Sequence, residues 1–93
     1  MDEPVDASEL REILVAALGR TGGVAFTRHA LDEMDEDGLD ELDIRRVLGR
    51  GRWDGCDFER GSWRYCWRIP GVVAVVAIID ADRVRIVTAW RER

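Results

Sequence analysis

Val72-Val73-Ala74-Val75-Val76-Ala77-Ile78-Ile79 is the longest uninterrupted apolar segment of this 93-residue chain. Its Val and Ile residues favour extended backbone, and successive side chains of a strand point to opposite faces of a sheet. Since both faces of this segment are apolar, we expect it to be an interior strand that is covered at least in part on both sides.

Further strand-like segments lie on either side of this one in the sequence. They are Trp53 to Phe58, Trp63 to Ile69 and Arg83 to Trp90. The connections between consecutive segments are short and compatible with turns, and they read Glu59-Arg60-Gly61-Ser62, Pro70-Gly71 and Asp80-Ala81-Asp82. Short connections of this kind predict an antiparallel meander.

Helical periodicity characterises the preceding half of the chain. Asp6 is placed to cap a helix that Gly19 ends, and Thr27 is placed to cap a second helix that Gly38 ends. A third helix is predicted from about Asp40 to Leu48.

These elements predict an α+β fold, with a single domain over residues 1–93. The N-terminal helices are expected to pack on one face of a four-stranded antiparallel sheet. A short extended piece, Val24-Ala25-Phe26, could make the sheet five-stranded. Residues 1–7 are expected to be disordered.

Side-chain alternation assigns residues to the two faces of the sheet. In one strand, one face carries Trp63, Tyr65, Trp67 and Ile69, and the other carries Arg64, Cys66 and Arg68. In the last strand, Val84, Ile86, Thr88 and Trp90 oppose Arg83, Arg85, Val87, Ala89 and Arg91. If the aromatic and aliphatic rows face the helices, the other face presents Arg64, Arg68, Arg85 and Arg91. Such arginines could hold phosphates, or they could simply keep an exposed sheet in solution.

Charge is divided unevenly along the chain. The formal net charge is −5, but residues 1–43 carry 3 Arg and 13 acids, whereas residues 44–93 carry 11 Arg and 6 acids. A net negative charge of the whole chain disfavours nonspecific binding of nucleic acid, yet the C-terminal half could present an electropositive surface. The alternative is solvated surface charge with ion pairs between the halves.

Cysteine and histidine are too few and too dispersed to predict a metal site, and no cofactor is expected. Cys56 and Cys66 are expected to be reduced and partly buried. A three-residue loop at Arg60-Gly61-Ser62 would place them opposite one another, whereas an even-length loop would offset them.

Two features bear on the membrane. No apolar stretch is long enough to cross a bilayer, and the N-terminus is acidic where a signal peptide needs a basic region. We therefore expect a soluble cytoplasmic protein with no membrane partner.

The chain has one histidine, His29, at the start of the second predicted helix. Histidine is the side chain whose ordinary pKa lies nearest neutrality, so this position decides whether histidine-based acid–base catalysis is available. The alternative is a half-buried structural ring that bonds to backbone or to a carboxylate where helix meets sheet.

The chain resembles a small family of bacterial domains grouped with the RelE-like and MqsR-like toxins of toxin–antitoxin modules. The resemblance runs from about Val24 to Arg91 and covers most of the chain. Its motifs are His29-Ala30-x-x-Glu33-Met34-x-x-Asp37-Gly38-Leu39, Asp43-Ile44-x-x-Val47-Leu48 with Gly51, and Ile86-Val87-Thr88-Ala89-Trp90.

This resemblance implies a fold of the barnase–EndoU–colicin–RelE type and a toxin of a bacterial type II pair, which cleaves messenger RNA without a metal. It implies a cognate antitoxin as partner, and RNA as substrate. His29 would serve as base or acid, with Arg64 and Arg85 acting on the phosphate. The residues expected to bind RNA are Arg68, Arg91, Tyr65 and Trp63.

Two positions depart from the family pattern. The family commonly has Arg where this chain has Glu33 and Asp37. The resulting acidic helix favours a different function, in which the same fold is a non-catalytic module that binds a protein partner.

Overall fold

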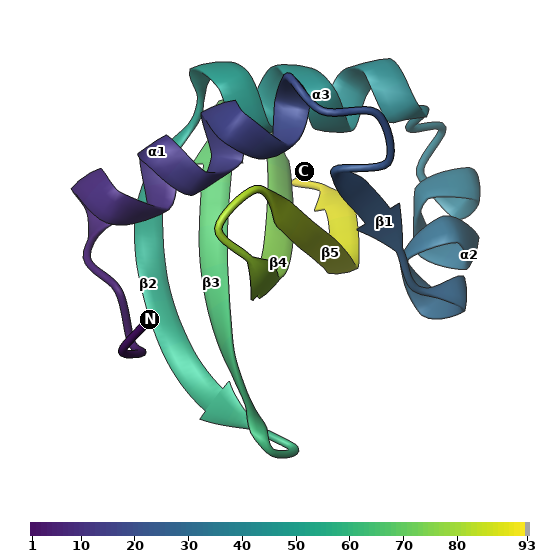
Figure 1. Ribbon diagram of the computed structural model, residues 1–93. Helices are drawn as coiled ribbons and strands as arrows, with labels where there is room; N and C mark the ends of the chain where they lie inside the picture. Colours follow the sequence, from purple (N-terminus) through teal and green to yellow (C-terminus); the bar gives the residue numbers. More distant parts are fainter. Residues whose placement is uncertain (93) are drawn as a thin grey trace.

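The apolar segment forms strand β4 (Val72–Asp80) in the middle of a five-stranded sheet (Figure 1). The structure is a computed structural model and describes residues 1–92. The other elements, in chain order, are α1 (Ala7–Leu18), β1 (Val24–Phe26), α2 (Arg28–Glu36), α3 (Glu41–Arg50), β2 (Arg52–Glu59), β3 (Ser62–Ile69) and β5 (Arg83–Arg91). The α+β fold class is confirmed.

The sheet has the strand order β1-β5-β4-β3-β2. Strands β2 to β5 form the predicted antiparallel meander. The fifth strand, β1, is present but pairs with β5 in parallel, with Val24 opposite Val84. The antiparallel direction expected for the whole sheet was therefore wrong at this edge, because no hairpin joins β1 to β5.

Side-chain caps begin the helices as the sequence indicates. The Asp6 carboxylate accepts from the backbone N–H of Glu9 at 2.8 Å, and the Thr27 hydroxyl accepts from that of Ala30 at 3.0 Å. Asp40 caps α3, in a reciprocal capping box with the first turn of that helix.

Helices α1 and α3 lie side by side across one face of the sheet, whereas α2 stands at its edge beside β1 (Figure 1). The core between the helices and the sheet contains fully buried side chains of both layers, among them Leu10, Leu14, Ile44, Leu48, Tyr65, Trp67 and Val76. The opposite face of the sheet, which α1 and α3 do not cover, is called the open face below.

The segment before α1 is attached to the sheet rather than disordered. Val5 is 4% exposed and belongs to the core. Its backbone N–H donates to the Tyr65 hydroxyl at 3.1 Å, and that hydroxyl donates to the Glu3 carboxylate at 2.8 Å. The expectation of disorder was wrong here because a partner 60 residues away in the sequence satisfies the segment's backbone.

Tyr65→Phe is expected to destabilise the protein by about 1–3 kcal/mol, because the Val5 N–H loses its buried acceptor. Burial raises the pKa of the Tyr65 phenol to about 12. Above pH 10 the unfolded phenol loses its proton while the folded one keeps it, so the wild type should lose stability between pH 10 and about 12. Denaturant unfolding at neutral and alkaline pH measures both effects.

Because Tyr65 is the chain's single tyrosine, the phenolate absorbance of the folded protein reports this group alone. Equal alkaline loss of stability in the wild type and in Tyr65→Phe would contradict this account of Tyr65.

One irregularity in β5 changes the predicted faces. Val75 pairs with Thr88 and Val76 pairs with Ile86, so Val87 has no partner in β4. Such a bulge reverses the alternation of the residues that follow it. Beyond it Ala89 lies in the helix-side core, and Thr88 and Trp90 lie on the open face.

Candidate active site on the open face of the sheet

Three rows of side chains cross the open face between β3 and β5, since directly paired strand residues share a face. The first row is Arg68, Val73 and Trp90, and the second is Cys66, Val75 and Thr88. Ala77 and Arg85 form the third, and Arg64 lies at its β3 end, two residues from Cys66. The predicted positions of Arg64, Arg68 and Arg85 on one face therefore agree with the strand register.

A hollow of about 460 Å³ lies where this face meets the start of α2. Its lining comes from α2 and its cap, the β2–β3 hairpin and β5: Thr27, His29, Glu59, Arg60, Arg64, Val87 and Thr88. The hollow thus brings together His29 and Arg64, which lie 35 positions apart in the sequence.

Thr27 positions the start of α2 against β5. Its backbone N–H donates to the Ile86 carbonyl at 3.0 Å, and its hydroxyl donates to the Val87 carbonyl at 2.8 Å. The same hydroxyl accepts from the N–H of Ala30, so one side chain caps the helix and ties it to the bulged strand. This attachment places His29 at the rim of the hollow.

The His29 ring is oriented by a carboxylate. Its Nε2 lies 2.8 Å from the Glu33 carboxylate, one helical turn along α2. A carboxylate can only accept, so Nε2 carries a hydrogen, and in the neutral ring Nδ1 has the lone pair that can accept a proton. The side chain is 66% exposed, and this does not fit the half-buried structural ring considered above.

Arg64 is the cation best placed to meet a ligand. It lines the hollow at His29 and also an adjoining hollow of about 340 Å³. Among residues 1–92 no carboxylate forms an ion pair with it, and its buried Nε has no hydrogen-bond partner. No hydrogen bond or ion pair within residues 1–92 occupies its terminal nitrogens, which can therefore bind an anion that enters either hollow.

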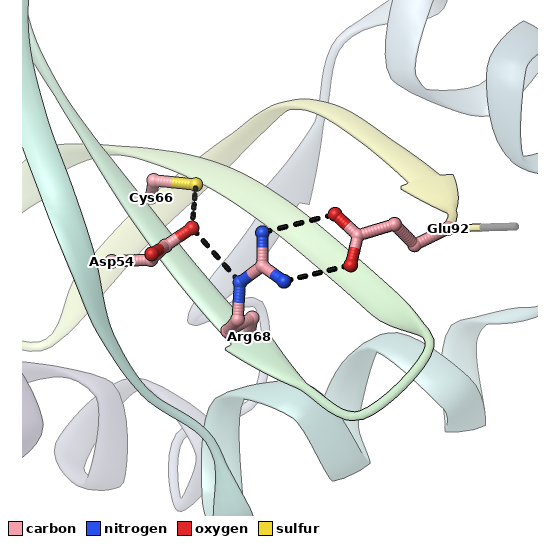
Figure 2. A network of polar contacts seen from close by, with 4 residues as sticks. All are labelled: Asp54, Cys66, Arg68 and Glu92. Atoms are coloured by element: carbon pink, nitrogen blue, oxygen red, sulfur yellow. Dashed lines mark hydrogen bonds and ion pairs between the residues drawn. The ribbon is translucent and has the colours of Figure 1, made fainter.

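Arg68 is instead saturated by the protein itself (Figure 2). Its guanidinium binds Glu92 in a bidentate manner at 2.7 and 3.0 Å and Asp54 at 2.8 Å. These carboxylates raise the pKa of Arg68. Arg68 is on the predicted face, but its charge is neutralised there, so it is a poor candidate for phosphate.

Two more predicted arginines are separated by the bulge. Arg85 precedes it and is exposed on the open face, without an ion pair among the described residues. Arg91 follows it and pairs with Val72 of the helix-side core, and its Nε donates to the Asp37 carbonyl at 3.2 Å. The prediction that Arg91 shares the open face was wrong.

Neither aromatic side chain proposed to stack on a base lies on the open face. Tyr65 is 0% exposed within the core. Trp63 packs against that core and contacts Phe58 edge to face, with ring centroids 5.4 Å apart. Burial excludes the stacking role expected for Tyr65, whereas Trp63 is partly exposed but lies on the helix side of the sheet and not on the open face.

The second hollow is acidic, with Asp54, Asp57 and Glu59 beside Arg64. Cys66 also lines it and donates to Asp54 at 3.7 Å. Burial and the Asp54 carboxylate raise the pKa of the Cys66 thiol, so it is a poor nucleophile. The hairpin has a two-residue turn, with Glu59 opposite Ser62, so Cys56 is offset from Cys66 and both thiols are free.

Three residues received no role at a site from the sequence: Glu33, which holds the His29 ring, and Arg60 and Thr88, which line the hollow. Glu33 follows His29 by four positions in a predicted helix, and this spacing by itself indicates a contact. Thr88 reaches the hollow only because of the bulge, and Arg60 because the hairpin carries it there.

Within residues 1–92 no cluster of His, Cys, Asp and Glu side chains has the arrangement needed to hold a metal ion. The three helices are also too short and too polar to cross a membrane.

Comparisons with known proteins give one match. Residues 26–91 match the family model described as Domain of unknown function (DUF4258). Searches of curated proteins and of solved structures found nothing similar. The match covers most of the chain but provides no link to the RelE-like toxins or the barnase–EndoU superfamily.

Proposed function

This chain belongs to the DUF4258 family, and we propose that it is a metal-independent RNA endonuclease, the toxin of a bacterial type II toxin–antitoxin pair. The observation that carries the proposal is the hollow that His29 and Arg64 line together. It offers a group able to move a proton beside a free cation, the two requirements for cleaving RNA at its own 2′-hydroxyl.

The proposed reaction is an internal transesterification. The ribose 2′-oxygen attacks the neighbouring phosphorus and its proton passes to Nδ1 of His29. The bond from phosphorus to the 5′-oxygen breaks, and the His29 imidazolium gives the proton back to that oxygen. The products are a 2′,3′-cyclic phosphate and a 5′-hydroxyl, so atoms and charge balance without a metal or water as nucleophile.

Glu33 supports His29 in this scheme. Its carboxylate holds the ring through Nε2 at 2.8 Å and stabilises the imidazolium that forms when Nδ1 takes the proton. Glu33, one of the two departures from the family pattern, therefore orients and stabilises His29 in the proposed reaction.

Arg64 would hold the phosphate, because its guanidinium has unused donors and lines the hollow. Negative charge grows on the phosphate oxygens during attack, and a fixed cation stabilises that charge most in the transition state. Arg60 lines the same hollow, and Arg85 adds a further positive charge on the open face.

The assignment to a toxin–antitoxin pair rests on the sequence resemblance. An antitoxin would silence the protein by covering the open face and its free arginines. Expression without the partner should then arrest growth, and the neighbouring gene should encode a small DNA-binding protein. Normal growth after induction of the folded protein would contradict this assignment.

The cleavage itself is tested with purified protein and end-labelled RNA in excess EDTA. We expect fragments that end in a 2′,3′-cyclic phosphate, and no cleavage when the RNA carries 2′-deoxy sugars throughout. Intact RNA, or cleavage of the deoxy strand, would overturn the proposed mechanism.

One observation favours the non-catalytic module. Carboxylates surround much of the open face, since Asp54, Asp57 and Glu59 line the second hollow and Glu92 occupies Arg68. Such a surface suits a basic protein partner. In that case His29→Ala should leave partner binding nearly unchanged, whereas the endonuclease requires His29.

A further inference from the structure

Trp90 lies on the open face rather than in the core. It pairs with Val73, whereas the neighbouring pair Ala74 and Ala89 belongs to the helix-side core. Since residues opposite one another share a face and neighbours alternate, Trp90 points away from α1 and α3. It is partly exposed there.

The other three tryptophans have different surroundings. Trp67 is 0% exposed in the core, and Trp53 and Trp63 pack against that core. Trp90 is therefore the tryptophan that the bulge in β5 places on the open face.

The surroundings of Trp90 divide the open face into two chemically different ends. Thr88, two residues away, lines the hollow at His29, and two residues of a strand span roughly 7 Å. Arg64 lines the same hollow, and Arg85 lies farther along the open face. In the row of Trp90, the nearest cation, Arg68, is occupied by Asp54 and Glu92 (Figure 2), and Arg52 lies one strand farther away, opposite Arg68.

This arrangement favours one orientation of a nucleotide on the open face. Phosphate requires unpaired cations, which the Arg64 end supplies, whereas a base requires a flat aromatic face and no charge. Between the two ends the floor of the face is formed by small or neutral side chains, Cys66, Val75 and Thr88. The carboxylates on Arg68 would repel a phosphate placed next to Trp90.

We propose that Trp90 stacks on the base adjacent to the phosphate held at His29 and Arg64, so that the substrate is single-stranded RNA with that base unpaired. The inference rests on the proposed function in that it takes RNA as the ligand. Bases of a duplex stack on one another and leave no face free for Trp90, so duplex RNA is excluded as a substrate.

The test measures binding without cleavage. The probe is a short fluorescent RNA of mixed sequence with 2′-O-methyl groups, whose 2′-oxygens cannot attack, alone or annealed to its complement. Fluorescence anisotropy should show that the wild-type protein binds the single strand more tightly than the duplex. Trp90→Ala should weaken single-strand binding about 5- to 150-fold, the measured range for loss of one stacked base.

Two further variants separate stacking from folding. Trp90→Phe keeps an aromatic face and should retain most of the affinity, whereas Trp90→Leu keeps the apolar bulk and should bind as weakly as Trp90→Ala. Trp63→Ala is the matched control on the other face and should bind like the wild type. Thermal unfolding of each variant shows whether the fold is kept.

The outcomes distinguish this inference from the proposed activity. Equal single-strand binding by Trp90→Leu and the wild type, equal binding of duplex and single strand, or no binding of RNA by the wild type would each overturn the role of Trp90. Binding that depends on Trp90 without cleavage of unmodified RNA would leave that role standing and overturn the endonuclease. If the wild type and all Trp90 variants cleaved RNA at equal rates, the endonuclease would stand and the role of Trp90 would be overturned.

Discussion

His29→Ala is expected to reduce RNA cleavage about 100- to 10,000-fold, the usual contribution of a positioned acid–base group. The fold should not suffer, because the ring is 66% exposed and its contact with Glu33 is a surface pair of the kind worth at most about 1 kcal/mol. Initial rates of cleavage and thermal unfolding, measured on the same preparation, check both halves of this prediction.

A pair of charge-neutralising substitutions on α2 provides the control. Glu33→Gln removes the carboxylate that orients His29 and should lower the cleavage rate without changing affinity for the uncleavable RNA. Asp32→Asn removes the same charge from the same helix, but Asp32 lies 3.4 Å from Arg28 instead, so the rate should hardly change. Similar rates in the two variants would show that Glu33 acts only through charge.

Gly51→Ala is expected to destabilise the protein by about 3 kcal/mol, at the upper end of the range for overpacking. Gly51 lies between α3 and β2, where the chain passes close to the backbone of α3 and to β3. A Cβ at this position would lie 2.7 Å from Cδ1 of Trp67 and 2.8 Å from the Arg68 carbonyl oxygen, and also against the Val47 carbonyl. None of these neighbours can move without disturbing the core, so the melting temperature should fall by about 12–24 °C.

Gly49→Ala is the matched control, two residues earlier and within α3. Its added Cβ would meet only Leu18 Cδ1, at an ordinary 3.6 Å. Alanine has the higher helix propensity, so this variant should gain about 0.5–1 kcal/mol. If Gly51→Ala had the same melting temperature as Gly49→Ala, the close packing inferred around Gly51 would be refuted.

The strand order of the meander and the starts of the helices could be predicted because the signals for them are local. The apolar segment 72–79, the turns around it and the caps Asp6 and Thr27 each depend on a few neighbouring residues. The direction of β1 could not be predicted in this way, because it pairs with a strand 60 positions away.

The candidate site was predictable only in part. Alternation assigned Arg64 and Arg85 to one face, and the register agrees with that assignment. The same rule failed at Thr88, Trp90 and Arg91, all of which follow the unpaired Val87. The alternating pattern of residues within one strand does not reveal a bulge, because a bulge depends on how that strand pairs with its neighbour.

The two departures from the family pattern illustrate the same limit. From the sequence, Glu33 and Asp37 suggested an acidic helix for a partner. In the fold Glu33 orients His29, and the Asp37 carboxylate accepts from the backbone N–H of Arg91 at 2.7 Å. Glu33 therefore contributes to the proposed chemistry, and Asp37 attaches the end of α2 to the end of β5.

By itself the sequence determined that this protein has helices on one side of a sheet, because periodicity, caps and turns act over a few residues and do not depend on the rest of the chain. Only the tertiary structure decided which side chains meet. His29 and Arg64 share a hollow because Thr27 ties α2 to β5. Trp90 lies on the same open face because the unpaired Val87 shifts the alternation of the side chains that follow by one residue.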